Sequence, residues 1–288
     1  MTETVRIASG DLVAEIADLG AELQSLTTAE GRALLWSGDP AFWTGRSPVL
    51  FPIVGKAPGD RIAVDGVDYP MAQHGFARRS AFTLAEAGAS ACRHVLVACE
   101  ATRAAYPFDF RLEVAHRLDG PMLTVTAEVR NEDARPMPFG LGFHPAFLWP
   151  LPGAAGRAHT IVLDNGAEPP LARLAGGLLV AEELLSPFRS GRLVLDHALF
   201  ADDAMIFPEG AGTGLRYAPE GGAGLRFHFD NLPNLALWTK PGAPYICIEP
   251  WHGMAARDGE SGEIAARPFS QTLEPGASAR FSFSVVVE

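Results

Sequence analysis

Cysteine is scarce in the sequence, and its three copies, Cys92, Cys99 and Cys247, form no CxxC pair and have no histidine at zinc-finger spacing. An odd number of scattered cysteines argues against a disulfide framework and provides no structural metal site. We therefore expect three reduced thiols.

Long apolar runs are also missing. No stretch reaches about 18 uninterrupted apolar residues, which is close to the length that a membrane-spanning helix needs. The first six residues, MTETVR, lack the basic segment followed by an apolar segment that marks a secretory signal. These two absences predict a cytoplasmic protein that makes no use of a membrane.

Positive charge is in short supply, with 23 Lys and Arg against 34 Asp and Glu and a net charge of −11. Without a basic stripe, such a chain is poorly suited to bind a nucleic-acid backbone or an anionic membrane surface. We expect a small-molecule partner and no nucleic acid. The composition says nothing about the oligomeric state.

The 288 residues are 48% hydrophobic and 20% charged, so the chain can bury a large core, which excludes intrinsic disorder. No linker-like stretch divides it, and we expect residues 1–288 to form one domain. The 30 glycines and 23 prolines interrupt the chain so often that few windows can hold a long helix. Strands are therefore the expected elements.

Alternating apolar and polar residues predict strands, and two Gly-containing reversals predict hairpins. The expected strands are 11–18, 94–100, 110–118, 122–130 and 279–287; the hairpins turn at Asp119-Gly120 and within 215–229. Only 178–188 has helical composition, and Pro187 would end that helix. His159 reads as an exposed loop residue. The pattern predicts an all-β fold, a sandwich of large antiparallel sheets with few short helices.

Three ionisable residues stand inside strongly apolar segments: His74 in QHGFAR, His144 in GFHPAF and Glu249 in YICIEPW. Burial of such groups costs free energy unless they are paired or used. Two histidines and a glutamate are the usual side chains for proton transfer near neutral pH. Taken alone, Glu249 should emerge at the end of a strand and could equally form an ion pair with Arg78.

Other chemistries find less support in the sequence. Two histidines and a glutamate can bind catalytic zinc, but these three residues include no local ligand pair, so we expect no metal. The GxSxG elbow of serine hydrolases and the GxGxxG pattern of dinucleotide-binding folds are both absent. Trp251 is typical of a ring that stacks on sugars, and equally of a core tryptophan.

Seven segments in order along nearly the whole chain resemble the aldose 1-epimerase (mutarotase) family, and most closely its LacX-like and hexose-6-phosphate mutarotase branches. They are 20–26 (GAELQSL), 35–40 (LWSGDP), 46–55 (RSPVLFPIVG), 74–78 (HGFAR), 142–147 (GFHPAF), 199–207 (LFADDAMIF) and 248–251 (IEPW). Each motif is weak by itself, but their common order is specific. The resemblance implies a galactose-mutarotase-like β-supersandwich whose site is a groove on a concave sheet face.

The resemblance also implies roles for individual residues. Glu249 corresponds to the base that takes the proton from the anomeric hydroxyl, and His144 to the acid that protonates the ring oxygen. His74 would bind beside the ring oxygen. Arg78 and Asp203, or Asp202 in its place, correspond to sugar-hydroxyl contacts. No cofactor is implied.

The expected reaction is therefore the interconversion of the α and β anomers of an aldohexose. One alternative is the same reaction on a hexose 6-phosphate, with Arg46, Lys56 or Arg78 binding the phosphate. Another is a non-catalytic sugar-binding or sugar-sensing protein. Relatives commonly have Asn where this chain has Leu148, which leaves the identity of the sugar open.

Overall fold

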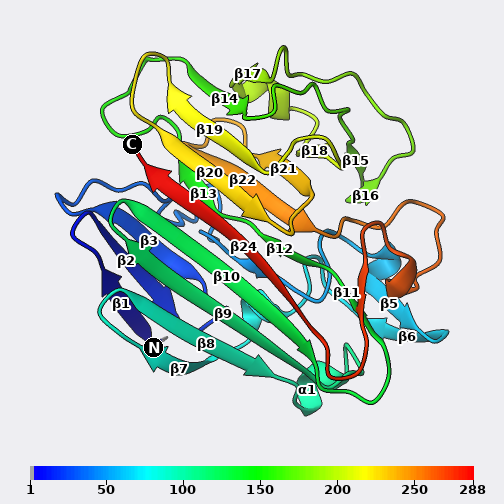
Figure 1. The fold of residues 1–288 in the computed structure, drawn as a ribbon. Coiled ribbons are helices and arrows are strands. Elements are labelled where there is room, and N and C mark those ends of the chain that lie inside the picture. The colour runs from blue at the N-terminus through cyan, green and yellow to red at the C-terminus, as the bar shows by residue number, and fades with distance from the viewer. Residues whose placement is uncertain (1–2) are drawn as a thin grey trace.

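The computed structural model describes residues 3–288 and confirms the all-β expectation (Figure 1). In this part of the chain the one α-helix, α1 (Glu100–Arg103), is a single turn, and no helix is long and apolar enough to cross a membrane. Four 3-10 turns complete the helical content: η1 (Pro58–Asp60), η2 (Ala77–Arg79), η3 (His197–Phe200) and η4 (Ile264–Ala266). Residues 1–2, which begin the MTETVR segment, lie outside the described residues.

The largest sheet has nine antiparallel strands and forms one layer of the molecule (Figure 1). In spatial order they are β17 (Arg192–Val194), β14 (His159–Leu163), β19 (Gly214–Pro219), β20 (Leu225–Asp230), β24 (Ser278–Val287), β10 (Met122–Asn131), β9 (Phe110–Asp119), β8 (Ala91–Val97) and β7 (Thr83–Ala87).

A second sheet of six strands carries the candidate site. Its strands are β18 (Met205–Phe207), β21 (Asn234–Trp238), β22 (Tyr245–His252), β12 (Leu141–Phe143) and β4 (Val49–Leu50), with β13 (Ala146–Leu148) paired to β22. Smaller sheets join β1 (Thr4–Ala8), β2 (Leu12–Ala17) and β3 (Leu23–Thr28); β5 (Arg61–Val64) and β6 (Val67–Pro70); β11 (Met137–Phe139) and β23 (Gln271–Leu273); and β15 (Leu174–Ala175) and β16 (Leu178–Leu179).

The predicted strands correspond to β2, β8, β9, β10 and β24, with the boundaries of β8 shifted toward its start. Both hairpins form as expected. Asp119 and Met122 pair across the first reversal, where Gly120 has φ +53°, a conformation that glycine adopts without a steric penalty. The second joins β19 to β20.

Aromatic side chains fill the space between the two large sheets. The Phe143 ring of β12 lies 5.0 Å from that of Phe283 in β24, and the Phe147 ring of β13 lies 5.1 Å from that of Phe227 in β20, both edge to face. Such pairs contribute about 0.5–1.5 kcal/mol beyond the area they bury. This packing fixes the six-stranded sheet, and hence the segment containing His144, against the nine-stranded sheet.

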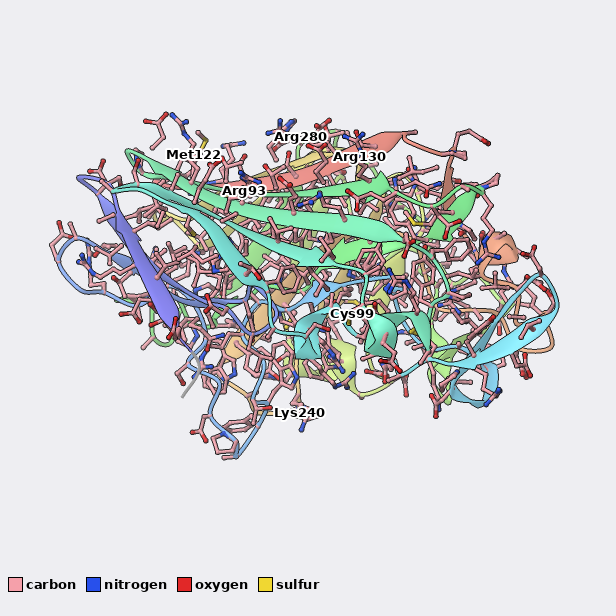
Figure 2. The ribbon with its side chains drawn as sticks, turned by 90° about the horizontal axis from the view of Figure 1, so that it is seen from below. Arg93, Cys99, Met122, Arg130, Lys240 and Arg280 are labelled. Atoms are coloured by element: carbon pink, nitrogen blue, oxygen red, sulfur yellow. The ribbon has the colours of Figure 1, made fainter. Side chains whose placement is uncertain are left out.

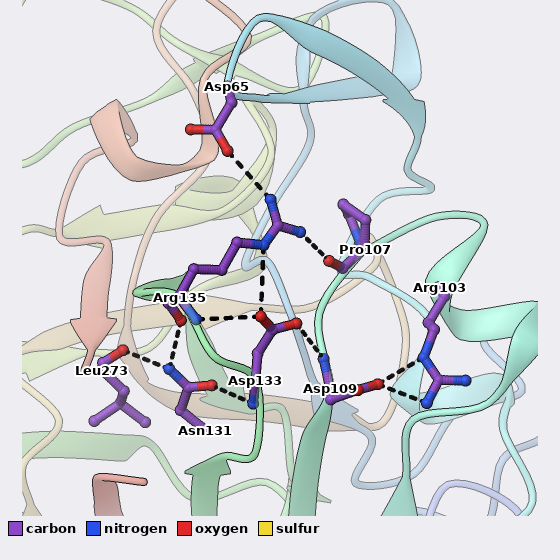
Figure 3. Close-up of polar contacts among 8 residues, drawn as sticks. All are labelled: Asp65, Arg103, Pro107, Asp109, Asn131, Asp133, Arg135 and Leu273. Carbon is purple, nitrogen blue, oxygen red and sulfur yellow. Dashed lines mark hydrogen bonds and ion pairs between the residues drawn. The ribbon is translucent and has the colours of Figure 1, made fainter. Parts of the chain in front are cut away.

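A polar network holds the chain where it leaves the nine-stranded sheet (Figure 3). Asn131, fully buried at the end of β10, donates to the carbonyls of Arg135 at 2.9 Å and Leu273 at 2.8 Å. Its side-chain oxygen accepts from the Asp133 amide, and the Asp133 carboxylate accepts from the amides of Arg135 and Asp109. These bonds fix the turn that directs the chain into β11 and β12.

The exposed face of the nine-stranded sheet lies on the opposite side of the molecule from Lys240 (Figure 2). Arg93, Arg130 and Arg280 project from this face. A hollow of about 650 Å³ on it is lined by charged side chains, including the Arg93–Glu113 ion pair at 2.7 Å, and contains none of the predicted site residues.

Two local expectations were wrong. Residues 178–188 form no helix; instead β16 pairs with β15 and the Leu184 amide bonds the Leu171 carbonyl, so contacts with neighbouring segments override the helical composition. His159 is 1% exposed at the start of β14, where its Nε2 accepts from the Leu151 amide at 3.1 Å.

Candidate active site

A cavity of about 330 Å³ lies over the face of the six-stranded sheet that points away from the main core. The structure brings together six of the seven predicted site residues around it: His74, Arg78, His144, Asp203, Glu249 and Trp251. Lys240, labelled in Figure 2, donates to the carbonyl of Phe42, which directly precedes the lining residue Trp43.

Strand β22 presents Glu249 to the cavity. Its even-numbered residues Ile246 and Ile248 belong to the main core, whereas Cys247, Glu249 and Trp251 point to the opposite face. Glu249 therefore lies within an eight-residue strand that is buried on both faces, and the expectation that it emerges at a strand end was wrong. A strand buried on both faces reads as a continuous apolar run, which conceals its alternation.

His144 is the partner of Glu249. It lies between β12 and β13 as expected for a strand end, and its Nε2 is 3.2 Å from Oε2 of Glu249. Glu249 is 1% exposed and His144 7%, so the pair is almost fully removed from bulk water. Nδ1 of His144 has no hydrogen-bond partner in the described chain, which leaves it available to a ligand.

Burial keeps both members of the pair in their neutral forms. Desolvation raises the pKa of the Glu249 carboxyl well above its usual range, and the nearby Asp203 charge raises it further. Desolvation also lowers the pKa of His144 to about 3. A carboxylic acid and a neutral imidazole hold one proton between them. Oε2 of Glu249 has no hydrogen-bond partner in the described chain, so the 3.2 Å approach of Nε2 is a close contact that lacks hydrogen-bond geometry, and proton transfer requires a small reorientation of either side chain.

His74 lies on a tight turn after β6, with φ +65°, and Gly75 follows with φ +70°. Its Nδ1 accepts a hydrogen bond from the Gly55 amide at 3.1 Å, and its Nε2 lies 3.3 Å from the Gln73 side-chain nitrogen. Burial first, and then the His144 and Arg78 charges, hold the pKa of His74 well below its usual value. A neutral ring that accepts at Nδ1 carries its proton on Nε2, and the Gln73 side-chain amide then has to turn its oxygen toward that proton.

Arg78 and Asp203 provide charged groups that the protein itself does not pair. The Arg78 guanidinium makes no hydrogen bond or ion pair within the described residues, and its burial lowers the pKa to about 10. Asp203 lines the cavity, whereas Asp202 does not. The Asp203 backbone has φ +67° and is held by a bond of 2.8 Å from Arg173 to its carbonyl.

Arg46 and Lys56, the other two cations considered for a phosphate, do not line the cavity. The Arg46 guanidinium donates to the Ser37 carbonyl at 2.7 Å and to the Gln24 side chain at 2.5 Å. The Lys56 side chain packs beside Gly177. Arg78 is thus the one basic side chain among the described lining residues.

Tryptophans form the apolar part of the wall. The indole of Trp251 lies across Gly142 so closely that a Cβ there would be 2.5 Å from its Cδ1. Trp43 packs on the His144 ring at 4.8 Å, and Trp238 meets that ring edge on at 5.7 Å. Trp43 and Trp238 were not predicted from the sequence, because isolated tryptophans carry no periodic signal.

Leu148, the position that departs from the family pattern, does not line the cavity. It packs instead against a buried cluster that includes Trp36 and Tyr245, and the wall residues Trp43 and Trp238 pack against the same cluster.

His144, Cys247 and Glu249 offer metal-type donor atoms within 4.8 Å of one another. Burial and the neighbouring Glu249 raise the pKa of the Cys247 thiol well above its usual value, which disfavours the thiolate that binds metals. Two of the three donors already contact each other. The arrangement fits a proton-transfer pair better than a metal centre.

Cys247→Ser combined with exhaustive chelation tests this interpretation. We expect activity within a few-fold of wild type in both cases, because the proton-transfer pair remains intact. The measurement is enzyme turnover before and after dialysis against a chelator, with metal content determined in parallel. Loss of activity on chelation and its recovery with one metal equivalent would identify a metal enzyme instead.

Comparison with known proteins finds similarity along nearly the whole chain. The aldose 1-epimerase family model matches residues 3–285. The chromosomal LacX protein of Lactococcus lactis subsp. lactis is 29% identical over 99% of each chain. A galactose mutarotase-related enzyme from Lactobacillus acidophilus is 28% identical, with a TM-score of 0.94 over 99% of this chain and 97% of its own. A galactose mutarotase-like protein from Lactobacillus casei is also 28% identical, with a TM-score of 0.92 over 99% and 100%.

Proposed function

The chain belongs to the aldose 1-epimerase family and is an isomerase, and we propose that it interconverts the α and β anomers of a free aldohexose. The observation that carries this proposal is the buried His144–Glu249 pair, 3.2 Å apart, at the floor of a cavity. Its volume of about 330 Å³ is near the lower end of the range for ligand sites, roughly 300–1,000 Å³, and suits one monosaccharide.

Ring opening needs one proton removed and one delivered. The reaction begins when the shared proton moves from the neutral Glu249 carboxyl group to His144. The Glu249 carboxylate then takes the proton of the anomeric hydroxyl, the oxygen lone pair forms the C1 carbonyl, and the bond from C1 to the ring oxygen breaks. The His144 imidazolium donates its proton to the departing ring oxygen. Rotation about the C1–C2 bond and the reverse transfers close the ring with the other configuration. The pair holds one proton before and after each step, so no cofactor is required.

The remaining groups bind and orient the sugar. The Nε2–H of His74 and the guanidinium of Arg78 act as donors, and the Asp203 carboxylate accepts from hydroxyls. Trp43, Trp238 and Trp251 offer apolar ring faces to the sugar's C–H groups. These contacts hold the anomeric edge over the proton-transfer pair.

The lining favours a neutral sugar over a phosphorylated one. A phosphate would have to share a cavity with the carboxyl groups of Asp203 and Glu249, and Arg78 is the one cation in the described lining to receive it. We expect a higher kcat/KM for the free aldohexose than for its 6-phosphate. Arg46→Gln and Lys56→Gln should not change the ratio of the two values, because neither side chain reaches the cavity. A selective loss with the phosphorylated sugar in either variant would identify a hexose-6-phosphate epimerase.

The test of the proposed function is an anomer-exchange measurement by NMR or polarimetry on a panel of free and 6-phosphorylated aldoses. We expect acceleration with at least one free aldohexose. Tight binding of sugars without any acceleration would contradict the proposal and favour a sugar-binding protein.

A further inference from the structure

Arg267 lies outside the cavity, just after η4, yet it is 6% exposed and lacks a carboxylate partner among the described residues. Its guanidinium donates only to backbone carbonyls: Val54 at 2.8 Å, Met254 at 3.0 Å and Lys56 at 3.3 Å. Burial of an unpaired charge is costly, so the bonds that it makes have to repay that cost. The bonds to Val54 and Lys56 join the segment 54–56 to Arg267, and the bond to Met254 joins Arg267 to the residues directly after β22.

The bond from Arg267 to the Val54 carbonyl affects His74 through a single peptide group. The Val54 carbonyl and the Gly55 N–H belong to the same planar peptide group and point in opposite directions. Arg267 bonds this carbonyl on one side, and on the other the N–H donates to Nδ1 of His74 at 3.1 Å. The cation also polarises the peptide, which makes its N–H a stronger donor. Gly55 also makes a second hydrogen bond with His74, in which the Gly55 carbonyl accepts from the His74 backbone amide at 2.9 Å.

Without the Arg267 guanidinium, the Val54–Gly55 peptide could flip, so that its carbonyl and its N–H exchange places. Gly55 has φ +71°, and the absence of a Cβ removes the usual steric barrier to such a reversal. A reversed peptide would present its carbonyl to Nδ1, and the neutral ring would then carry its proton there and offer an acceptor at Nε2. Of the other charged or titratable groups near His74, Arg78, Arg79 and His144 disfavour its cationic form, and Asp203 and Glu249 line the same cavity.

We propose that Arg267 is a positioning residue that fixes His74 in its Nε2–H form through the Val54–Gly55 peptide, so that the cavity receives a hydrogen-bond donor. The part of this inference that concerns sugar rests on the function proposed above. The tautomer itself can be measured in the ligand-free protein and does not depend on turnover.

The test is ¹⁵N NMR of the histidine rings in wild type, Arg267→Lys and Arg267→Met, with His74→Gln to assign the signals. In wild type we expect a protonated Nε2, an unprotonated Nδ1 and a scalar coupling from the Gly55 amide across its hydrogen bond to Nδ1. In Arg267→Met we expect a mixture of tautomers, titration of His74 closer to its ordinary range, and kcat lower by about 10²-fold with a smaller change in KM. Arg267→Lys keeps the positive charge and should lie between Arg267→Met and wild type.

Arg173→Lys is the matched control. Arg173 also donates only to backbone carbonyls beside the cavity, those of Leu199, Asp202, Asp203 and Ala204, but it does not contact segment 54–56. Its variant should keep the wild-type His74 spectrum. A single Nε2–H form with an unchanged pH response in folded Arg267 variants would overturn the proposal. If neither variant folds, the wild type decides: an Nδ1–H ring or no coupling to the Gly55 amide would overturn it, and the expected form with that coupling and exchange-protected Arg267 guanidinium protons would support it.

Discussion

Glu249→Gln is expected to lose most anomer exchange while it still binds sugar. The amide keeps the shape of the carboxyl group and can still form hydrogen bonds, but it cannot take the anomeric proton. One positioned acid or base typically contributes about 10²- to 10⁴-fold, and we expect a loss in that range. Anomer exchange is measured by NMR, and sugar binding by quenching of the fluorescence of the tryptophans that line the cavity.

The loss should not come from unfolding. Burial raises the pKa of Glu249 in the folded protein above its unfolded value, so the folded state binds more protons and its stability falls as the pH rises through this interval. Each unit of that difference corresponds to about 1.4 kcal/mol. Gln cannot ionise, and Glu249→Gln should therefore be at least as resistant to thermal unfolding as wild type at neutral pH. Glu128→Gln, on the exposed face of the nine-stranded sheet, is the control and should keep full activity.

Exchange within a few-fold of wild type in Glu249→Gln would contradict the proposed site. Loss of sugar binding together with loss of exchange would instead indicate that the carboxyl group mainly binds the ligand. The measurements of anomer exchange and of sugar binding distinguish these two outcomes.

The sequence predicts the sheets well where each strand has one face in the core. In β9 and β10 buried and less buried residues alternate along their whole length, and Asp119-Gly120 marks the reversal between them. Strand β22 lacks this alternation because apolar side chains from other segments also cover its second face. The pattern therefore identifies Glu249 as unusual without placing it at the middle of a strand.

The candidate site is harder to predict from patterns, because its members come from turns and strands far apart in the chain. His74, His144 and Glu249 stand out as polar residues in apolar segments, but only the family resemblance places them together. Arg267 gives no such signal. Its role depends on three backbone carbonyls that the fold brings to it, and backbone groups leave no trace in the residue pattern.

His144→Asn is expected to lose turnover to a similar extent as Glu249→Gln, because a neutral amide is too weak an acid to protonate the departing ring oxygen. The reverse step uses the same residue with its role exchanged, so both anomeric directions should slow equally. Thermal unfolding and tryptophan quenching again separate this loss from misfolding or failure to bind. Activity close to wild type would remove His144 from the reaction.

The pH dependence of the variants tests the shared proton directly. In wild type the active pair holds one proton, so activity should fall when a second proton binds at low pH and when the shared proton is lost at high pH. Burial lowers the pKa of His144 to about 3 and raises that of Glu249. The acid limb of the wild-type pH–rate profile should therefore lie below the ordinary pKa range of histidine, and the alkaline limb above the ordinary pKa range of glutamate.

In His144→Asn only the Glu249 base remains, and the residual rate should rise with pH and then level off. In Glu249→Gln only the His144 acid remains, and the residual rate should fall as the pH rises. If either variant kept both limbs of the wild-type profile, the pair could not be the source of the profile, and another group in the cavity would have to carry the proton.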